Sequence, residues 1–226
     1  MHPEPPVSES PKQSLGERRI SVPIAIAILV GTLALVVGGG VWTGYRFFWN
    51  RFDRTARLDA EVARWSRVVA QDPKDFEGQL QLGWSYFQKS DMDKALAAYK
   101  AAAEIEPENA GLVYNLGLVY LEEKQYEEAA RQFKALADKY PKHELAWFSL
   151  GQTYMQLSKV DDAIVTFQHT LGINPTSSDT RFALGSAYEQ VGKKDLAIGE
   201  YKEALQYDPK YEAASAALRR LGVTNP

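Results

Sequence analysis

The chain has 226 residues, 45% of them hydrophobic, and no cysteine, so it can bury apolar cores but has no disulfide, thiolate metal site or thiol nucleophile. Residues 1–71 contain nine Lys and Arg against six Asp and Glu, whereas residues 72–226 contain 17 against 23. The acidic C-terminal part lacks the basic face that binding to nucleic acid requires.

The first 45 residues divide into a polar tail and an apolar run. Residues 1–19 are rich in proline, serine and charge, and such a segment buries too little apolar surface to fold, so we expect a disordered tail. Residues 20–45 carry no charged side chain, and about 20 apolar helical residues span the roughly 30 Å hydrocarbon core of a bilayer. We therefore predict one transmembrane helix over 20–45 and a single-pass membrane protein that contacts lipid.

A cleaved signal peptide is the alternative for this apolar run. Its apolar core would be about 7–15 residues long and would end at a small-residue cleavage site. The run in this chain is longer and offers only glycines at its end, which favours a retained anchor. Arginines flank both ends of it, so the positive-inside rule leaves open the side of the membrane on which the C-terminal part lies.

Two features of the anchor indicate what surrounds it. Small residues at helical spacing form a stripe on which another membrane helix can dock, although glycine and alanine are common in such helices. The stripe consists of Ala27, Gly31, Ala34 and Gly38. Residues 46–72 then predict a basic juxtamembrane helix that also caps the next domain, with Arg46 and Arg51 placed to contact lipid headgroups. The alternative for its arginines is an ordinary solvated helix face.

Residues 76–211 consist of four units of 34 residues without insertion or deletion. The units share a Leu-Gly pair, a tyrosine, an alanine, an aromatic residue and a proline. These are the Leu-Gly pairs at 82–83, 116–117, 150–151 and 184–185, with Tyr86, Tyr120, Tyr154, Tyr188, Ala95, Ala129, Ala163, Ala197, Tyr99, Phe133, Phe167, Tyr201, Pro107, Pro141, Pro175 and Pro209. Gln79 and Arg181 depart from the large fourth-position residue that Val113 and Trp147 provide.

This pattern resembles the tetratricopeptide-repeat (TPR) family. The resemblance implies an all-α, right-handed solenoid of helical hairpins, with repeats 76–109, 110–143, 144–177 and 178–211 inside a domain spanning 73–226. One unit cannot bury its own apolar face, so neighbouring units must stack and the ends need caps. The segment 212–222 predicts the C-terminal capping helix, and Pro73 marks the end of a half-repeat that serves as the N-terminal cap.

The family resemblance also implies a ligand-binding concave face lined by the first helix of each unit. The positions that face inward are mainly apolar in the first two units and more polar in the last two. They are Leu80, Trp84, Phe87, Tyr114, Leu118, Leu121, Phe148, Gln152, Met155, Phe182, Ser186 and Glu189. At the offsets of the family's carboxylate clamp only Asn115 agrees, so we expect an apolar peptide or amphipathic helix as the ligand. The alternative is that these rings pack between helices.

No catalytic or nucleotide-binding motif occurs in the sequence, and the three histidines are scattered, so no enzyme activity, cofactor, metal or small-molecule substrate is expected. The expected function is that of a membrane-anchored scaffold or assembly factor that binds other proteins. A structural subunit of a larger membrane complex is the alternative, and an accessory role in the biogenesis of such a complex is a third possibility by analogy.

Overall fold

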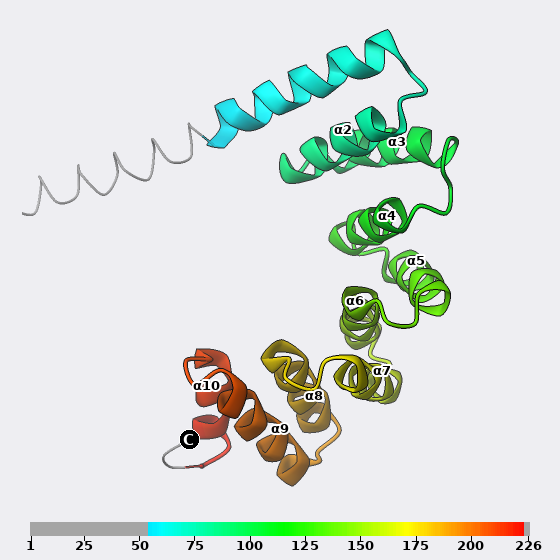
Figure 1. Cartoon of the computed structure of the whole chain (residues 1–226). Coiled ribbons are helices and arrows are strands. Elements are labelled where there is room, and N and C mark those ends of the chain that lie inside the picture. Colours follow the sequence, from blue (N-terminus) through cyan, green and yellow to red (C-terminus); the bar gives the residue numbers. More distant parts are fainter. Residues whose placement is uncertain (1–53, 224–226) are drawn as a thin grey trace, which may run out of the picture. The chain divides into compact units, whose positions relative to one another are not determined.

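The computed structural model describes residues 54–223, and the regular elements of that range are all helices (Figure 1). The chain divides into two compact units, Met1–Arg54 and Thr55–Pro226. The predicted transmembrane helix 20–45, its small-residue stripe and the two headgroup arginines at 46 and 51 lie outside the described residues. Among the residues that are described, no helix is both long and apolar enough to cross a membrane.

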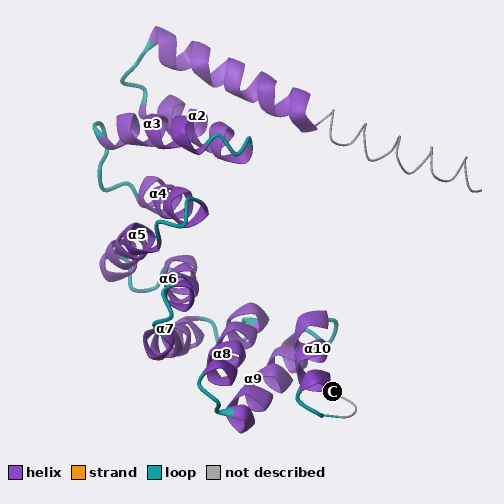
Figure 2. Ribbon diagram, turned by 180° about the vertical axis from the view of Figure 1, so that it is seen from behind, coloured by secondary structure: helices purple, strands orange, loops and turns teal. Residues whose placement is uncertain are grey.

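A helix over residues 54–71 is followed by nine more in the described part. These are α2 (Phe76–Gln88), α3 (Met92–Ala103), α4 (Ala110–Glu122), α5 (Tyr126–Lys139), α6 (Glu144–Gln156), α7 (Val160–Ile173), α8 (Ser178–Gln190), α9 (Lys194–Tyr207) and α10 (Glu212–Arg220). Each helix packs mainly on its neighbours in the chain, as in a solenoid (Figure 2). The predictions of an all-α fold and of helical-hairpin repeats are therefore confirmed.

The first helix of each unit begins with a side chain that accepts a backbone N–H. The four acceptors are Asp75, Asn109, His143 and Ser177, which occupy one position of the 34-residue repeat. The Nδ1 atom of His143 accepts from the amide of Ala146 at 3.1 Å. These caps satisfy amide groups that have no partner inside the helix. They explain why each hairpin starts where it does.

Each first helix ends in a turn that contains one residue with left-handed backbone. These residues are Ser90, Lys124, Ser158 and Gly192, with φ of 60°, 59°, 57° and 74°. The residue that follows donates its amide to the carbonyl of the repeated tyrosine, at 2.8–3.0 Å in the four units. This is the Schellman arrangement, and it turns the chain into the second helix.

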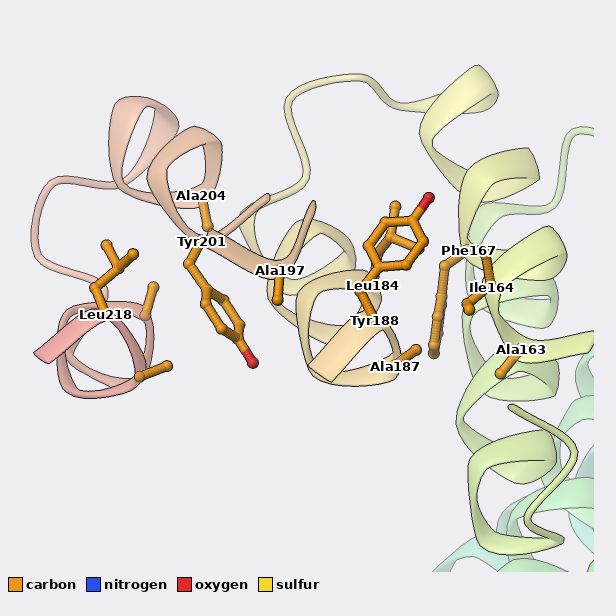
Figure 3. Packing of buried hydrophobic residues seen from close by; sticks show 12 residues of the cluster. Ala163, Ile164, Phe167, Leu184, Ala187, Tyr188, Ala197, Tyr201, Ala204 and Leu218 are labelled. Atoms are coloured by element: carbon orange, nitrogen blue, oxygen red, sulfur yellow. The ribbon is translucent and has the colours of Figure 1, made fainter. Parts of the chain in front are cut away.

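The repeated glycine of each first helix lies directly beneath the repeated aromatic ring of the second helix. A Cβ atom placed on Gly117 would lie 2.5 Å from Cε1 of Phe133, and the other three units have the same close approach at 2.5–2.6 Å. The four rings are buried, with at most 1% of their surface exposed. Figure 3 shows two of them, Phe167 and Tyr201, together with Tyr188, small and aliphatic side chains of the last two units, and Leu218 of the last helix.

Gln79 and Arg181, the two departures at the fourth position of the repeat, each form a side-chain hydrogen bond there. Gln79, Trp147 and Arg181 each donate a side-chain N–H to the carbonyl of the proline six residues earlier, at 3.2, 3.0 and 3.0 Å. Val113 has no such donor. In three of the four units the fourth position therefore provides an N–H donor, a property that side-chain size does not indicate.

The helix over 54–71 contacts α2 along its length. Leu58 is buried, the Cγ1 atom of Val68 lies 3.1 Å from the place that a Cβ on Gly78 would take, and Asp59 forms an ion pair with Lys89. At the other end α10 packs on α9 through Ala217 and Leu218. Helices thus cover both ends of the repeat array, where caps are expected.

Candidate protein-binding groove

The predicted groove residues lie on the first helices α2, α4, α6 and α8. In Figures 1 and 2, α4, α6 and α8 lie on the inner side of the array and α5 and α7 on the outer side. The side chains of the predicted groove residues are half-buried, except those of Gln152 and Trp84, which are exposed. Such partly exposed apolar side chains on one face form a surface that a partner can cover.

A groove of about 720 Å³ joins three successive first helices. It brings together six of the predicted residues: Leu121, Phe148, Gln152, Met155, Phe182 and Ser186. Several other residues that line it were not predicted from the repeat offsets, among them Tyr126, Asp179, Ala183 and Tyr211. Tyr211 precedes the capping helix, and no repeat position could have indicated that it reaches the groove.

The groove has apolar walls and a few polar groups at defined places. The hydroxyl of Tyr211 donates to Oδ1 of Asp179 at 2.7 Å, and burial together with this hydrogen bond raises the pKa of Tyr211 to about 12. The ring of Phe182 lies 5.5 Å from that of Tyr211. Glu122 and Asp179 are acidic and Lys124 is basic, so the charged groups of the lining nearly balance. A groove of this kind suits an apolar ligand with little net charge.

In the first two units the predicted residues pack partly into the core. Leu80 and Phe87 lie against the buried cluster around Tyr99, and Tyr114 and Leu118 lie against that around Phe133. Asn115 is half-buried.

Trp84 stays 37% exposed in the first unit, and its ring stacks on Phe87 with centroids 5.3 Å apart and planes at 15°. The sequence analysis placed the apolar part of the face in the first two units. The 720 Å³ groove extends from the end of α4 in the second unit over the third and fourth, where aromatic rings from α6, α8 and the turn before α10 meet.

The two histidines of the described part have structural surroundings. His143 caps α6, and the ring of His169 lies 4.1 Å from that of Trp147. Among residues 54–223 no group of three His, Cys, Asp or Glu is arranged to hold a metal ion.

Three family models of the tetratricopeptide repeat match the chain, over residues 83–124, 114–178 and 178–211. Together these matches cover more than half of the sequence, in the part where the helical hairpins and their glycine–aromatic contacts occur. The chain is a TPR protein. No curated protein matches its sequence.

Solved structures of other TPR proteins resemble this one. The crystal structure of MamA matches with a TM-score of 0.65 and 23% identity, over 71% of this chain and 94% of that one. The AMB-1 form of MamA matches with a TM-score of 0.62 and 26% identity, over 69% and 92%. YrrB, described as a TPR protein with an unusual peptide-binding site, matches with a TM-score of 0.64 and 19% identity, over 75% and 88%. Since 330 solved chains match, the fold alone does not select a partner.

Proposed function

We propose that this TPR protein is a membrane-anchored interaction scaffold or assembly factor that binds an apolar segment of another protein on its concave face. The observation that carries the proposal is the groove of about 720 Å³, lined by aromatic and aliphatic side chains of α4, α6 and α8. Grooves of this composition bind amphipathic helices or apolar peptides. The likeness to YrrB, which is described as having a peptide-binding site, supports a peptide as the ligand.

Membrane anchoring is the second part of the proposal, and it is supported by the uncharged run 20–45. In this arrangement the stripe from Ala27 to Gly38 packs against another membrane helix, and Arg46 and Arg51 contact lipid headgroups. The anchor keeps the groove beside the bilayer, where the apolar segments of membrane proteins become available during assembly. A permanent place in a membrane complex is the alternative, and the stoichiometry of the purified material distinguishes the two.

Affinity purification of the full chain in mild detergent tests the groove when variants are compared. Gln152→Arg places a charge on an exposed groove position, whereas Val165→Arg places the same charge on α7 at a side chain that is 65% exposed and outside the groove. We expect Gln152→Arg to lower partner recovery at least tenfold, since central interface positions contribute about 2 kcal/mol or more. Val165→Arg should leave it unchanged. Equal recovery from both variants would contradict the proposal.

Extraction of the membrane fraction with alkaline carbonate tests the anchor. The full chain should stay with the membrane, and a chain lacking residues 20–45 should be released. Release of both would refute the anchor while leaving the groove proposal intact.

A further inference from the structure

The hydroxyl of Tyr99 is buried and has no hydrogen-bond partner in the described part of the chain. Tyr99 is the repeated aromatic residue of the first unit. Phe133 and Phe167 fill the same position in the next two units, so the repeat folds without a hydroxyl at this place. A buried O–H group without an acceptor is destabilising, and its presence therefore calls for a reason.

The fourth unit shows where this hydroxyl points. Tyr201 lies over Gly185 as Tyr99 lies over Gly83, with nearest distances to a Cβ position of 2.6 and 2.5 Å. Its hydroxyl lies 3.0 Å from Oε2 of Glu189 and 3.2 Å from Oγ of Ser186. Both partners lie on the concave face of α8. The ring of Tyr99 therefore directs its hydroxyl to the same two positions of α2.

In the first unit those two positions hold aromatic residues. Trp84 replaces the serine and Phe87 replaces the glutamate, three repeat periods earlier in the sequence. The two rings are stacked, and Trp84 is 37% exposed. Since Phe87 packs against the cluster that contains Tyr99, the correspondence with the fourth unit places the hydroxyl beneath this aromatic pair, whose outer ring faces solvent. Burial raises the pKa of the Tyr99 hydroxyl, so the group remains a protonated donor.

We propose that Trp84 and Tyr99 form a binding site for an extended, uncharged segment of the partner protein. In this site an apolar side chain of the partner stacks on Trp84, the indole shifts, and the Tyr99 hydroxyl donates to a main-chain carbonyl of the segment. The inference rests on the proposed function, since it names the conformation of the bound partner and the residues that contact it. It adds a subsite in the first unit, apart from the groove over the second to fourth units.

We expect the bound segment to be extended and its acceptor to be uncharged. Carbonyl groups inside a helix already accept from their own amides, whereas those of an extended segment are free. The surroundings of the hydroxyl also favour an uncharged acceptor, because burial alone raises the pKa of Tyr99 and no charged side chain contributes to that shift. A carboxylate would therefore be desolvated here without a compensating cation.

The test uses a library of random 12-residue peptides displayed on phage and selected on the full chain in detergent. Peptides eluted from the wild type are synthesised, and their affinities for Tyr99→Phe, Trp84→Ala and Gln152→Arg are measured by fluorescence anisotropy. We expect Tyr99→Phe to weaken a class of these peptides by about tenfold, as the loss of one hydrogen bond predicts. Trp84→Ala should weaken the same class, and prolines within these peptides should be tolerated because proline is incompatible with a helix interior.

A merely structural hydroxyl gives a different result. Tyr99→Phe would then change only the melting temperature, and every peptide would bind it as tightly as the wild type, which overturns the inference. If the recovered peptides are weakened by Gln152→Arg and none of them by Tyr99→Phe, the inference is overturned while the proposed function is supported. Recovery of no peptide also overturns it, whereas the purification experiment above decides the proposed function independently.

Discussion

Replacing Gly117 by alanine measures how strictly the close contact of the two helices in a unit is required. A Cβ atom at this position would lie 2.5, 2.8 and 2.9 Å from three carbons of the Phe133 ring. That ring is fully buried, so it has no solvent side to which it can move. Alanine also favours the helix over glycine, and the two effects oppose each other.

The magnitudes decide the sign of the effect. Overpacking a well-filled core costs about 1–3 kcal/mol, whereas alanine gains about 1 kcal/mol of helix propensity over glycine. We therefore expect Gly117→Ala to lower the free energy of unfolding by up to about 2 kcal/mol, or the melting temperature by up to roughly 8 °C. Gly199 is the matched control, because it lies within α9 and a Cβ there meets nothing within 4 Å. Gly199→Ala should be stabilising by about 1 kcal/mol.

Thermal unfolding of the full chain, followed by circular dichroism at 222 nm, compares the two variants. The double variant Gly117→Ala with Phe133→Leu provides a further check, since a smaller side chain removes the clash. The double variant should lose less free energy of unfolding than the two single variants together, by at least about 0.5 kcal/mol. If Gly117→Ala raised the melting temperature as Gly199→Ala does, the packing argument would be refuted.

Three further predictions concern the turns, the proline carbonyls and pH. Lys124→Gly should be stabilising by about 1 kcal/mol, because it removes a side chain from a left-handed residue with φ 59°. Gly192→Ala should be destabilising by a similar amount, because φ is 74° there although a Cβ atom would meet no neighbour within 4 Å. Urea unfolding measures both effects. Trp147→Phe removes the N–H that donates to Pro141 and should lower the free energy of unfolding by about 1 kcal/mol; an unchanged urea midpoint would contradict this role. The folded-state pKa of Tyr211 is about 12 against an ordinary 10.0, so its contribution to stability is present below pH 10 and is lost as pH rises towards 12. Tyr211→Phe should therefore show a smaller fall in urea midpoint between about pH 9 and about pH 11, and an equal fall would disprove it.

The candidate groove was predicted only in part. The offsets within the repeat place Phe148, Met155 and Phe182 on the first helices, and the structure brings them together. Tyr211 belongs to no repeat position that faces inward, and it joins the groove because the capping segment packs against α8 and α9. The shared N–H donors at the fourth position of the repeat were also missed, since a glutamine, a tryptophan and an arginine have little in common apart from that group.

What the sequence determined by itself is the local and periodic part of this protein. Contacts in a repeat array join helices that are neighbours in the chain, so a 34-residue period with its glycine, aromatic residue and proline is sufficient to predict the hairpins and their order. The tertiary structure alone decided which side chains meet across units. The position of the groove and the unpartnered hydroxyl of Tyr99 depend on the direction in which each ring leaves its helix, and spacing along the chain does not encode that direction.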